Sequence, residues 1–271
     1  MGIRILRGDD ARKVAEEAAE NLEEPAEAPP EVLALRRERR LSGPYEPGDI
    51  APLDFGGEAP SPGDLHLREP ATQIIVPPYG PEWTRGQANH WFTEAGTGRV
   101  FIRCVAGHMV GSPGNDQGGA NGLSLVMTTD RPAVVEARPL VSYRYLYQIG
   151  KLGGIGGGGK AAGGLEIQAY ATVSWGGGGI GGGGTHHTGE PYRSTWFDRG
   201  HGDSPIQVQD DGQEVGAHVK TRFHVSPGVK YTVKVGPWLA AHAWHSLGGA
   251  TGVGAAGAWI DLRIRWIVVA H

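Results

Sequence analysis

Apolar and polar residues alternate in short stretches over most of the chain after residue 70. The sequence KYTVKV at 230–235 is apolar at every second position, and AWIDLRIRW at 258–266 keeps the same period. Successive side chains of a β-strand point to opposite faces of its sheet, so this period predicts strands with one buried face. The strands predicted in this way span 72–76, 90–93, 99–105, 123–128, 134–137, 141–149, 165–175, 206–209, 215–225, 230–235 and 258–269.

Turn-forming sequences separate these stretches, and no regular helical pattern lies between them. SPGNDQGG, TTDRP, QDDGQ and VSPGV are rich in Gly, Pro, Asn and Asp, the residues that favour turns. Alternation along each strand also argues against a parallel sheet, whose strands are apolar on both faces. We therefore expect a mainly β fold, an antiparallel β-sandwich of the jelly-roll kind, over residues 71–271.

The first 70 residues follow a different pattern. Residues 9–24 and 31–41 are rich in helix-forming residues with apolar positions three and four apart, which predicts a helical N-terminal segment over 1–41. Residues 42–70 are rich in Pro and Gly but carry large apolar residues that a free linker does not need. We interpret 42–70 as an extended arm that docks on a partner, with a disordered tail as the alternative. The predicted docking residues are Tyr45, Ile50, Leu53 and Phe55.

Glycine makes up 46 of the 271 residues, well above the usual share of about 7%. Two tracts, 153–159 and 176–184, read GGIGGGG and GGGGIGGGG, and we expect them to form paired surface loops. Aromatic residues flank both tracts, and aromatics beside small-residue loops are typical of recognition surfaces. The predicted ligand or receptor surface consists of Trp175, Tyr192, Trp196, Ile155 and Ile180. An aromatic core at the ends of the sheets is the alternative, and it also suits Tyr143, Tyr145 and Tyr147, which share one face of a predicted strand.

Charge and composition exclude several classes of function. The formal net charge of −4 gives no general attraction to nucleic acid. The single cysteine, Cys104, has no partner for an internal disulfide and is expected to pack in a strand as a small apolar group. No run of 18 apolar residues predicts a membrane span, and the first residues lack the apolar core of a signal peptide.

The chain has no motif of nucleophilic catalysis or phosphate binding. His242 and His245 form a His-x-x-His pair, but in a strand such residues point to opposite faces, so we expect polar loop histidines and no metal site. Asp198, His201 and Asp203 in DRGHGDS lack the spacing of a calcium loop. We expect no enzyme, no catalytic residue and no cofactor; a hydrolase or lyase that uses His201 and Asp203 is an alternative.

The layout of the chain resembles that of a virion structural protein of a tailed bacteriophage. The resemblance rests on the helical and Pro-rich front, the glycine-rich β domain and the closing strand AWIDLRIRWIVVAH, and the two tracts are similar to the glycine-rich loops of phage tail-fibre adhesins. It implies a capsid, neck, tail or fibre component located in the virion and made in the host cytoplasm. The implied partners are other virion proteins, further copies of the chain (a trimer above all) and a host-surface glycan. A lectin-like glycan-binding module, with Trp175, Tyr192 and Trp196 stacked on sugar rings, is the alternative.

Overall fold

The computed structural model describes residues 3–6, 72–107, 115–152, 157–174, 183–189, 191–201, 206–215, 219–245 and 253–271. All regular structure in these ranges is β-strand, and every strand pair is antiparallel, which confirms the predicted mainly β, antiparallel class. None of these ranges holds a helix long and apolar enough to cross a membrane. The helices predicted at 9–24 and 31–41 and the docking residues Tyr45, Ile50, Leu53 and Phe55 lie outside the described residues.

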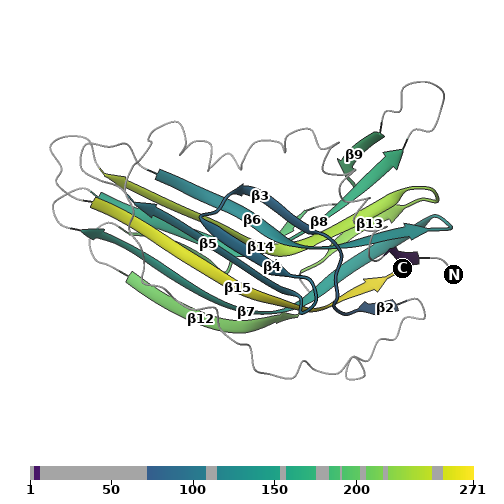
Figure 1. Ribbon diagram of the computed structural model, residues 1–271, viewed down its shortest axis with the longest axis horizontal. Helices are drawn as coiled ribbons and strands as arrows, with labels where there is room; N and C mark the ends of the chain where they lie inside the picture. The colour runs from purple at the N-terminus through teal and green to yellow at the C-terminus, as the bar shows by residue number, and fades with distance from the viewer. Residues whose placement is uncertain are drawn as a thin grey trace.

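The fifteen strands in the described part of the chain form two sheets, which Figure 1 shows as two layers lying one over the other. The strands of the first sheet, sheet A, are β1 (Ile3–Leu6), β3 (Glu82–Gln87), β6 (Asn115–Thr129), β8 (Gly157–Ser174), β9 (Gly183–His187), β10 (Tyr192–Arg193), β11 (Phe197–His201) and β14 (Lys230–His245). The strands of the second, sheet B, are β2 (Thr72–Ile75), β4 (His90–Glu94), β5 (Arg99–Gly107), β7 (Ala133–Leu152), β12 (Ile206–Val215), β13 (Thr221–Val225) and β15 (Val253–Ala270).

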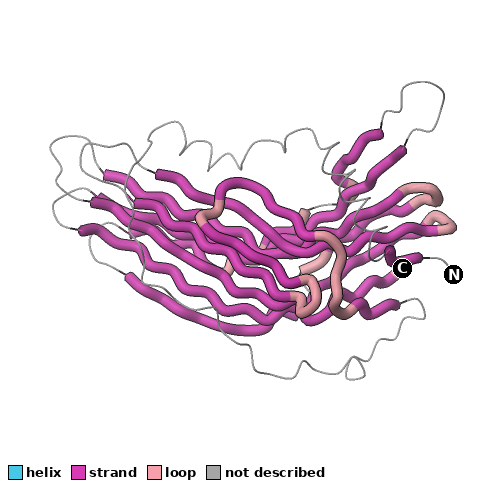
Figure 2. The backbone as a smooth tube through the Cα atoms, viewed as in Figure 1, coloured by secondary structure: helices cyan, strands magenta, loops and turns pink. Residues whose placement is uncertain are grey.

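Three strands form the centre of each sheet. In sheet A, β14 lies between β6 and β8; β1 and β3 pair with the outer edge of β6, and β9, β10 and β11 with that of β8. In sheet B, β15 lies between β7 and β5; β12 and β13 extend the sheet beyond β7, and β4 extends it beyond β5. Strands make up most of the described backbone, and short loops join them, as the tube in Figure 2 shows.

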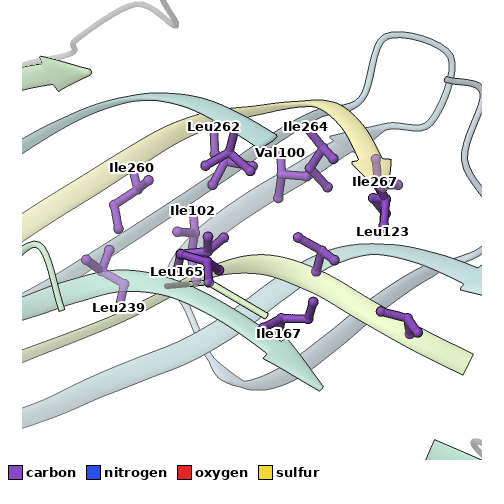
Figure 3. Packing of buried hydrophobic residues seen from close by; sticks show 14 of the residues in the cluster. Val100, Ile102, Leu123, Leu165, Ile167, Leu239, Ile260, Leu262, Ile264 and Ile267 are labelled. Carbon is purple, nitrogen blue, oxygen red and sulfur yellow. The ribbon is translucent and has the colours of Figure 1, made fainter. Parts of the chain in front are cut away.

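The core lies between the two sheets and is filled by the apolar face of each predicted alternation. Leu165 and Ile167 from β8 face Ile260 and Leu262 from β15 across this space, and all four are buried (Figure 3). Their removal from water stabilises the sandwich by roughly 1.5–3 kcal/mol per side chain. The alternation in β15 is interrupted once, because a bulge between Ile264 and Trp266 shifts the strand register.

Several strands are longer than predicted. The strands predicted at 134–137 and 141–149 are one continuous strand, β7. Of the sequences interpreted as turns, SPGNDQGG lies partly in β6, and QDDGQ lies wholly in β12. Those two turn predictions are therefore wrong for residues 115–119 and 209–213. The neighbouring strands supply the reason, because Asp210 and Asp211 are held in register opposite Tyr145 and Arg144 of β7. Pairing along a long neighbour outweighs the local preference for a turn.

The first strand, β1, belongs to the sandwich rather than to a helical N-terminal segment. Its residues Ile3–Leu6 pair with 126–129 of β6 in sheet A, whereas β2, the next described strand, pairs with β15 in sheet B. The two described strands that flank residues 7–71 in the sequence therefore belong to different sheets.

The described parts of the two glycine tracts lie toward opposite ends of β8. Residues 157–159 begin this strand of 18 residues, which spans about 60 Å, and Gly183 and Gly184 of β9 pair with its last two residues. Residues 157–159 of the first tract are strand rather than loop, and they are buried. The expectation of paired surface loops is therefore wrong for these residues.

Close approach of the two sheets explains why glycine occupies this part of β8. A Cβ on Gly159 would lie 2.1 Å from the backbone oxygen of Ala255 in β15, and one on Gly254 would lie 2.2 Å from the oxygen of Gly158. No side chain fits between two backbones at these distances. The core residues therefore change here from leucine and isoleucine to alanine and glycine, and the two sheets lie closer together.

Among the described residues, the ends of eight strands meet at this narrow end. The pairings Gly157 with His245, Val253 with Leu152 and Asn115 with Ala243 place the corresponding strand ends together. The pairs of strands joined across this end are β5 and β6, β7 and β8, β11 and β12, and β14 and β15. We refer to it as the glycine-lined end; β1 and the last residues of β15 lie at the other end (Figure 1).

Candidate binding groove

A groove of about 370 Å³ runs along one edge of the sandwich, where β11 of sheet A lies over β7 and β12 of sheet B. Its size falls within the range of small-ligand sites. The residues that line it are Tyr145, Tyr147, Thr195, Trp196, Phe197, Asp198, Arg199 and Val208.

Stacked aromatic rings form the floor of this groove. Trp196 packs almost parallel to Tyr143, with ring centroids 4.0 Å apart. Phe197 lies 4.8 Å from Tyr145 and 5.0 Å from Tyr147. The three tyrosines follow one another on a single face of β7, as their alternation predicted. Such stacks add roughly 0.5–1.5 kcal/mol per ring pair to the area that they bury.

Small residues in β8 make room for these rings. Phe197 is the register partner of Gly163, and a Cβ on Gly163 would lie 2.8 Å from the Phe197 ring. The backbone N–H of Trp196 donates to the Gly163 oxygen at 2.8 Å, which fixes the chain just before β11 begins. The glycines of β8 thus position the aromatic groove as well as the narrow core.

The rim of the groove is polar. The Tyr145 hydroxyl donates to Asp210 Oδ2 at 3.2 Å, and burial together with the Asp210 carboxylate raises the pKa of Tyr145 to about 12. Tyr145 is therefore a neutral hydrogen-bond donor at physiological pH. Asp198 pairs with Lys160 at 3.0 Å, and both Asp198 and Arg199 are exposed at the opening. An aromatic floor with a carboxylate and a guanidinium at its rim suits a flat, hydroxylated ligand that stacks and accepts or donates hydrogen bonds.

The structure brings together only part of the predicted ligand surface. Trp196 lines the groove and is partly buried. Tyr192 lies in β10 opposite Ile167, packs against the core and is not part of the groove. The other predicted residues, Trp175, Ile155 and Ile180, lie outside the described residues.

The candidate histidines and carboxylates of the sequence that the structure describes lie on two strands, β14 and β11. His242 and His245 both lie in β14, three residues apart, and not in a loop. His242 Nδ1 is bonded to Asp116 Oδ1. Asp198 and His201 are also three apart in one strand, β11, and Asp203 lies outside the described residues. No three His, Cys, Asp or Glu side chains gather into a metal site in the part of the chain that the structure describes.

Cys104 occupies a completely buried position in β5, as predicted. Burial raises the pKa of its thiol to about 12, so the side chain is a neutral, apolar group and not a nucleophile.

Sequence reasoning identified the aromatic residues of the groove but not the full length of its second wall. Val208 and Asp210 belong to β12, most of which lies in or after a sequence with strong turn signals. The strand predicted at 206–209 already contained Ile206 and Val208, and only the continuation of β12 to Val215 along its long partner strand was missed. No protein-family model matches the chain, and no curated protein matches it at a significant level.

Proposed function

We propose that the protein is a non-enzymatic structural component of a tailed-phage virion, in the capsid, neck, tail or fibre. It docks through the segment 42–70 and presents its β domain for assembly or contact with the host surface. The observation that supports this role most directly is the gathering of eight described strand ends at the glycine-lined end of one sandwich. Loops held together at one end of a rigid β scaffold are the usual place for recognition surfaces.

The anchoring of the segment 7–71 supports the docking part of this proposal. Strands on either side of it are paired into different sheets, so a partner that binds the segment is held close to the β domain. Ile50, Leu53 and Phe55 would each contribute roughly 1.5–3 kcal/mol if a partner buried them fully.

A substitution within the full chain tests the docking role without removing β1. The triple variant Ile50→Ser, Leu53→Ser, Phe55→Ser should incorporate into purified particles at least about tenfold less than the natural sequence, because several kcal/mol of burial are lost. Quantitative mass spectrometry of the particles gives the occupancy. The matched control is the triple variant Glu46→Gln, Asp49→Asn, Glu58→Gln, which changes three side chains of the same segment and should incorporate normally.

Two results would contradict the proposal. The first is normal occupancy of the apolar variant in particles. The second is the absence of the chain from purified particles of the phage that encodes it, with the protein present as a free monomer that turns over a small molecule.

The groove supports a second candidate, a glycan-binding module. A partly buried Trp196 above tyrosine rings, with Asp198 and Arg199 at the rim, provides stacking and hydrogen-bonding groups for a sugar. Glycan-array binding should fall with Asp198→Ala and Arg199→Ala, two exposed positions whose substitution leaves the aromatic stack in place. Arg222→Ala, at an exposed position of β13, is the control. Binding that is unchanged in both rim variants would reject the groove as the sugar site.

A further inference from the structure

A second polar cluster lies on the outer face of sheet A, away from the groove. Ser124 of β6, Lys234 of β14 and Gln168 of β8 are register partners on three neighbouring strands, so their side chains lie in one row. The adjacent positions Leu125 and Val233 face the core, which places this row on the opposite, outer face. Thr232 follows on the same face, two residues before Lys234.

The cluster holds more cations than carboxylates. Glu166 is 2% exposed at its side chain, and its Oε2 accepts from Arg85 at 2.7 Å and from Arg193 at 2.6 Å. Its other oxygen, Oε1, accepts from the Gln168 amide at 2.6 Å. The single carboxylate is thus shared by two guanidinium groups, and Lys234 is a third cation beside them.

Lys234 contacts aromatic rings instead of an acid. Its ammonium lies 4.6 Å from the centre of the Tyr170 ring and 5.8 Å from that of Trp83. Within the described residues no carboxylate lies within ion-pair distance of the ammonium. Burial, with the nearby Arg85 guanidinium, lowers the pKa of Lys234 to about 8.

Two hydroxyl groups next to Lys234 also lack a partner. Ser124 and Thr232 are each 1% exposed, and neither Ser124 Oγ nor Thr232 Oγ1 has a hydrogen-bond partner among the described residues. Buried hydroxyls in native proteins are nearly always bonded, so an orphaned pair beside an unpaired ammonium indicates a missing acceptor.

We propose that Ser124, Thr232 and Lys234, with Arg85 and Arg193 at the rim, form a binding site for an oxyanion, a carboxylate or phosphate group. The two hydroxyls donate to the oxyanion from the floor of the site, and the ammonium pairs with it. Trp83 and Tyr170 pack against the lysine side chain and hold it over the floor. Arg85, Arg193 and Lys234 carry three positive charges and Glu166 carries one negative charge, so the site has a net charge of +2.

Oxyanion binding at this site depends on pH through Lys234. The groups beside it are Arg85 from β3 and Glu166 and Tyr170 from β8. Arg193 from β10 pairs with Glu166, and the ring of His187 from β9 packs at a tilt against Tyr170. Burial raises the pKa of Tyr170 to about 12, so that phenol stays neutral. An oxyanion favours the ammonium form, so affinity is highest below pH 8 and falls as the pH rises through that value.

The test uses the full chain with lysine side chains labelled for NMR, and the probes are inorganic phosphate, acetate and, at equal ionic strength, chloride. Phosphate or acetate should shift the Lys234 signal saturably, with a dissociation constant of about 1–10 mM, the range expected of a single small anion. A response to phosphate alone identifies a phosphate group as the natural ligand. A response to acetate indicates a carboxylate, whether free or on a partner chain. A response to chloride of the same size as to both oxyanions would overturn the proposal.

Three variants make the test specific. Ser124→Ala removes a hydroxyl that has no hydrogen-bond partner among the described residues, so the unliganded protein should keep its stability while oxyanion affinity falls at least fivefold. Lys234→Gln should abolish the saturable stabilisation by phosphate or acetate in thermal unfolding. Lys160→Gln, which removes an exposed lysine of the same sheet, should leave binding unchanged. Equal affinity in Ser124→Ala and the natural sequence, or equal stabilisation of Lys234→Gln, would refute the site.

Discussion

Replacement of Gly159 by alanine should destabilise the sandwich strongly, although alanine is ordinarily the better strand residue. Gly159 has no positive φ that would demand glycine, and in an open strand alanine would gain roughly 0.5–1 kcal/mol. Here the added Cβ would lie 2.1 Å from the Ala255 backbone oxygen and 3.1 Å from Ala256 Cβ. Ordinary contact begins at 3.4 Å, so one sheet must move by 3.4 − 2.1 = 1.3 Å.

The cost of this movement falls on backbone rather than on a flexible side chain. Insertion of a methyl group into a closely packed interior typically costs 1–3 kcal/mol, and we expect a net loss of about 3 kcal/mol because both sheets are hydrogen-bonded here. Urea unfolding followed by tryptophan fluorescence measures it; with an m-value of about 3 kcal/mol per M, the midpoint falls by about 1 M.

Gly96→Ala is the matched control, because a Cβ on Gly96 meets nothing within 4 Å. This variant should be as stable as the natural sequence or slightly more so. If Gly159→Ala unfolds at the same urea concentration as Gly96→Ala, the sheets are not in backbone contact at the glycine-lined end, and the explanation of the first glycine tract is wrong.

Three further predictions concern single side chains. Asp261→Asn should cost about 3 kcal/mol in urea unfolding, because the fully buried carboxylate pairs with Arg99 through both oxygens, whereas Asp198→Asn at an exposed pair should cost less than about 1 kcal/mol. Cys104 should resist thiol reagents at pH 8 in the folded protein and react only in denaturant; labelling without unfolding would show that the thiol is not sealed in the core. Lys234→Met should stabilise the anion-free protein at pH 7, because the pKa of Lys234 is about 8 in the folded protein and 10.5 in the unfolded chain, so the folded state holds this proton less well. The gain in stability should vanish as the pH rises from 8 to 10.5. A difference in stability that does not change with pH would contradict the lowered pKa.

The sequence predicted the fold class well because alternation survives in the strands that build the core. Ile260, Leu262 and Ile264 face inward in the structure as their spacing indicated. Strand lengths were less predictable. Asp210 and Asp211 lie in a sequence that favours a turn, but they pair with β7, and the pattern of a single sequence does not show this pairing. The core role of 157–159 was also hidden, because glycine in a loop and glycine between two touching sheets look alike in a sequence.

The candidate sites show the same division. Trp196 was identified because aromatic residues are visible in a sequence, but its partners Tyr143, Phe197 and Val208 come together only through the packing of one sheet on the other. The row of Ser124, Lys234 and Gln168 was not predicted at all, since cross-strand neighbours depend on register, and register is fixed by the whole sheet.

Contact between the two backbones at Gly159 and Gly254 has a consequence for how molecules reach this protein. Many β-sandwiches and barrels admit a guest through an open mouth between their layers, and this fold closes that route with its own main chain. A ligand therefore cannot enter between the two sheets at Gly159 and Gly254.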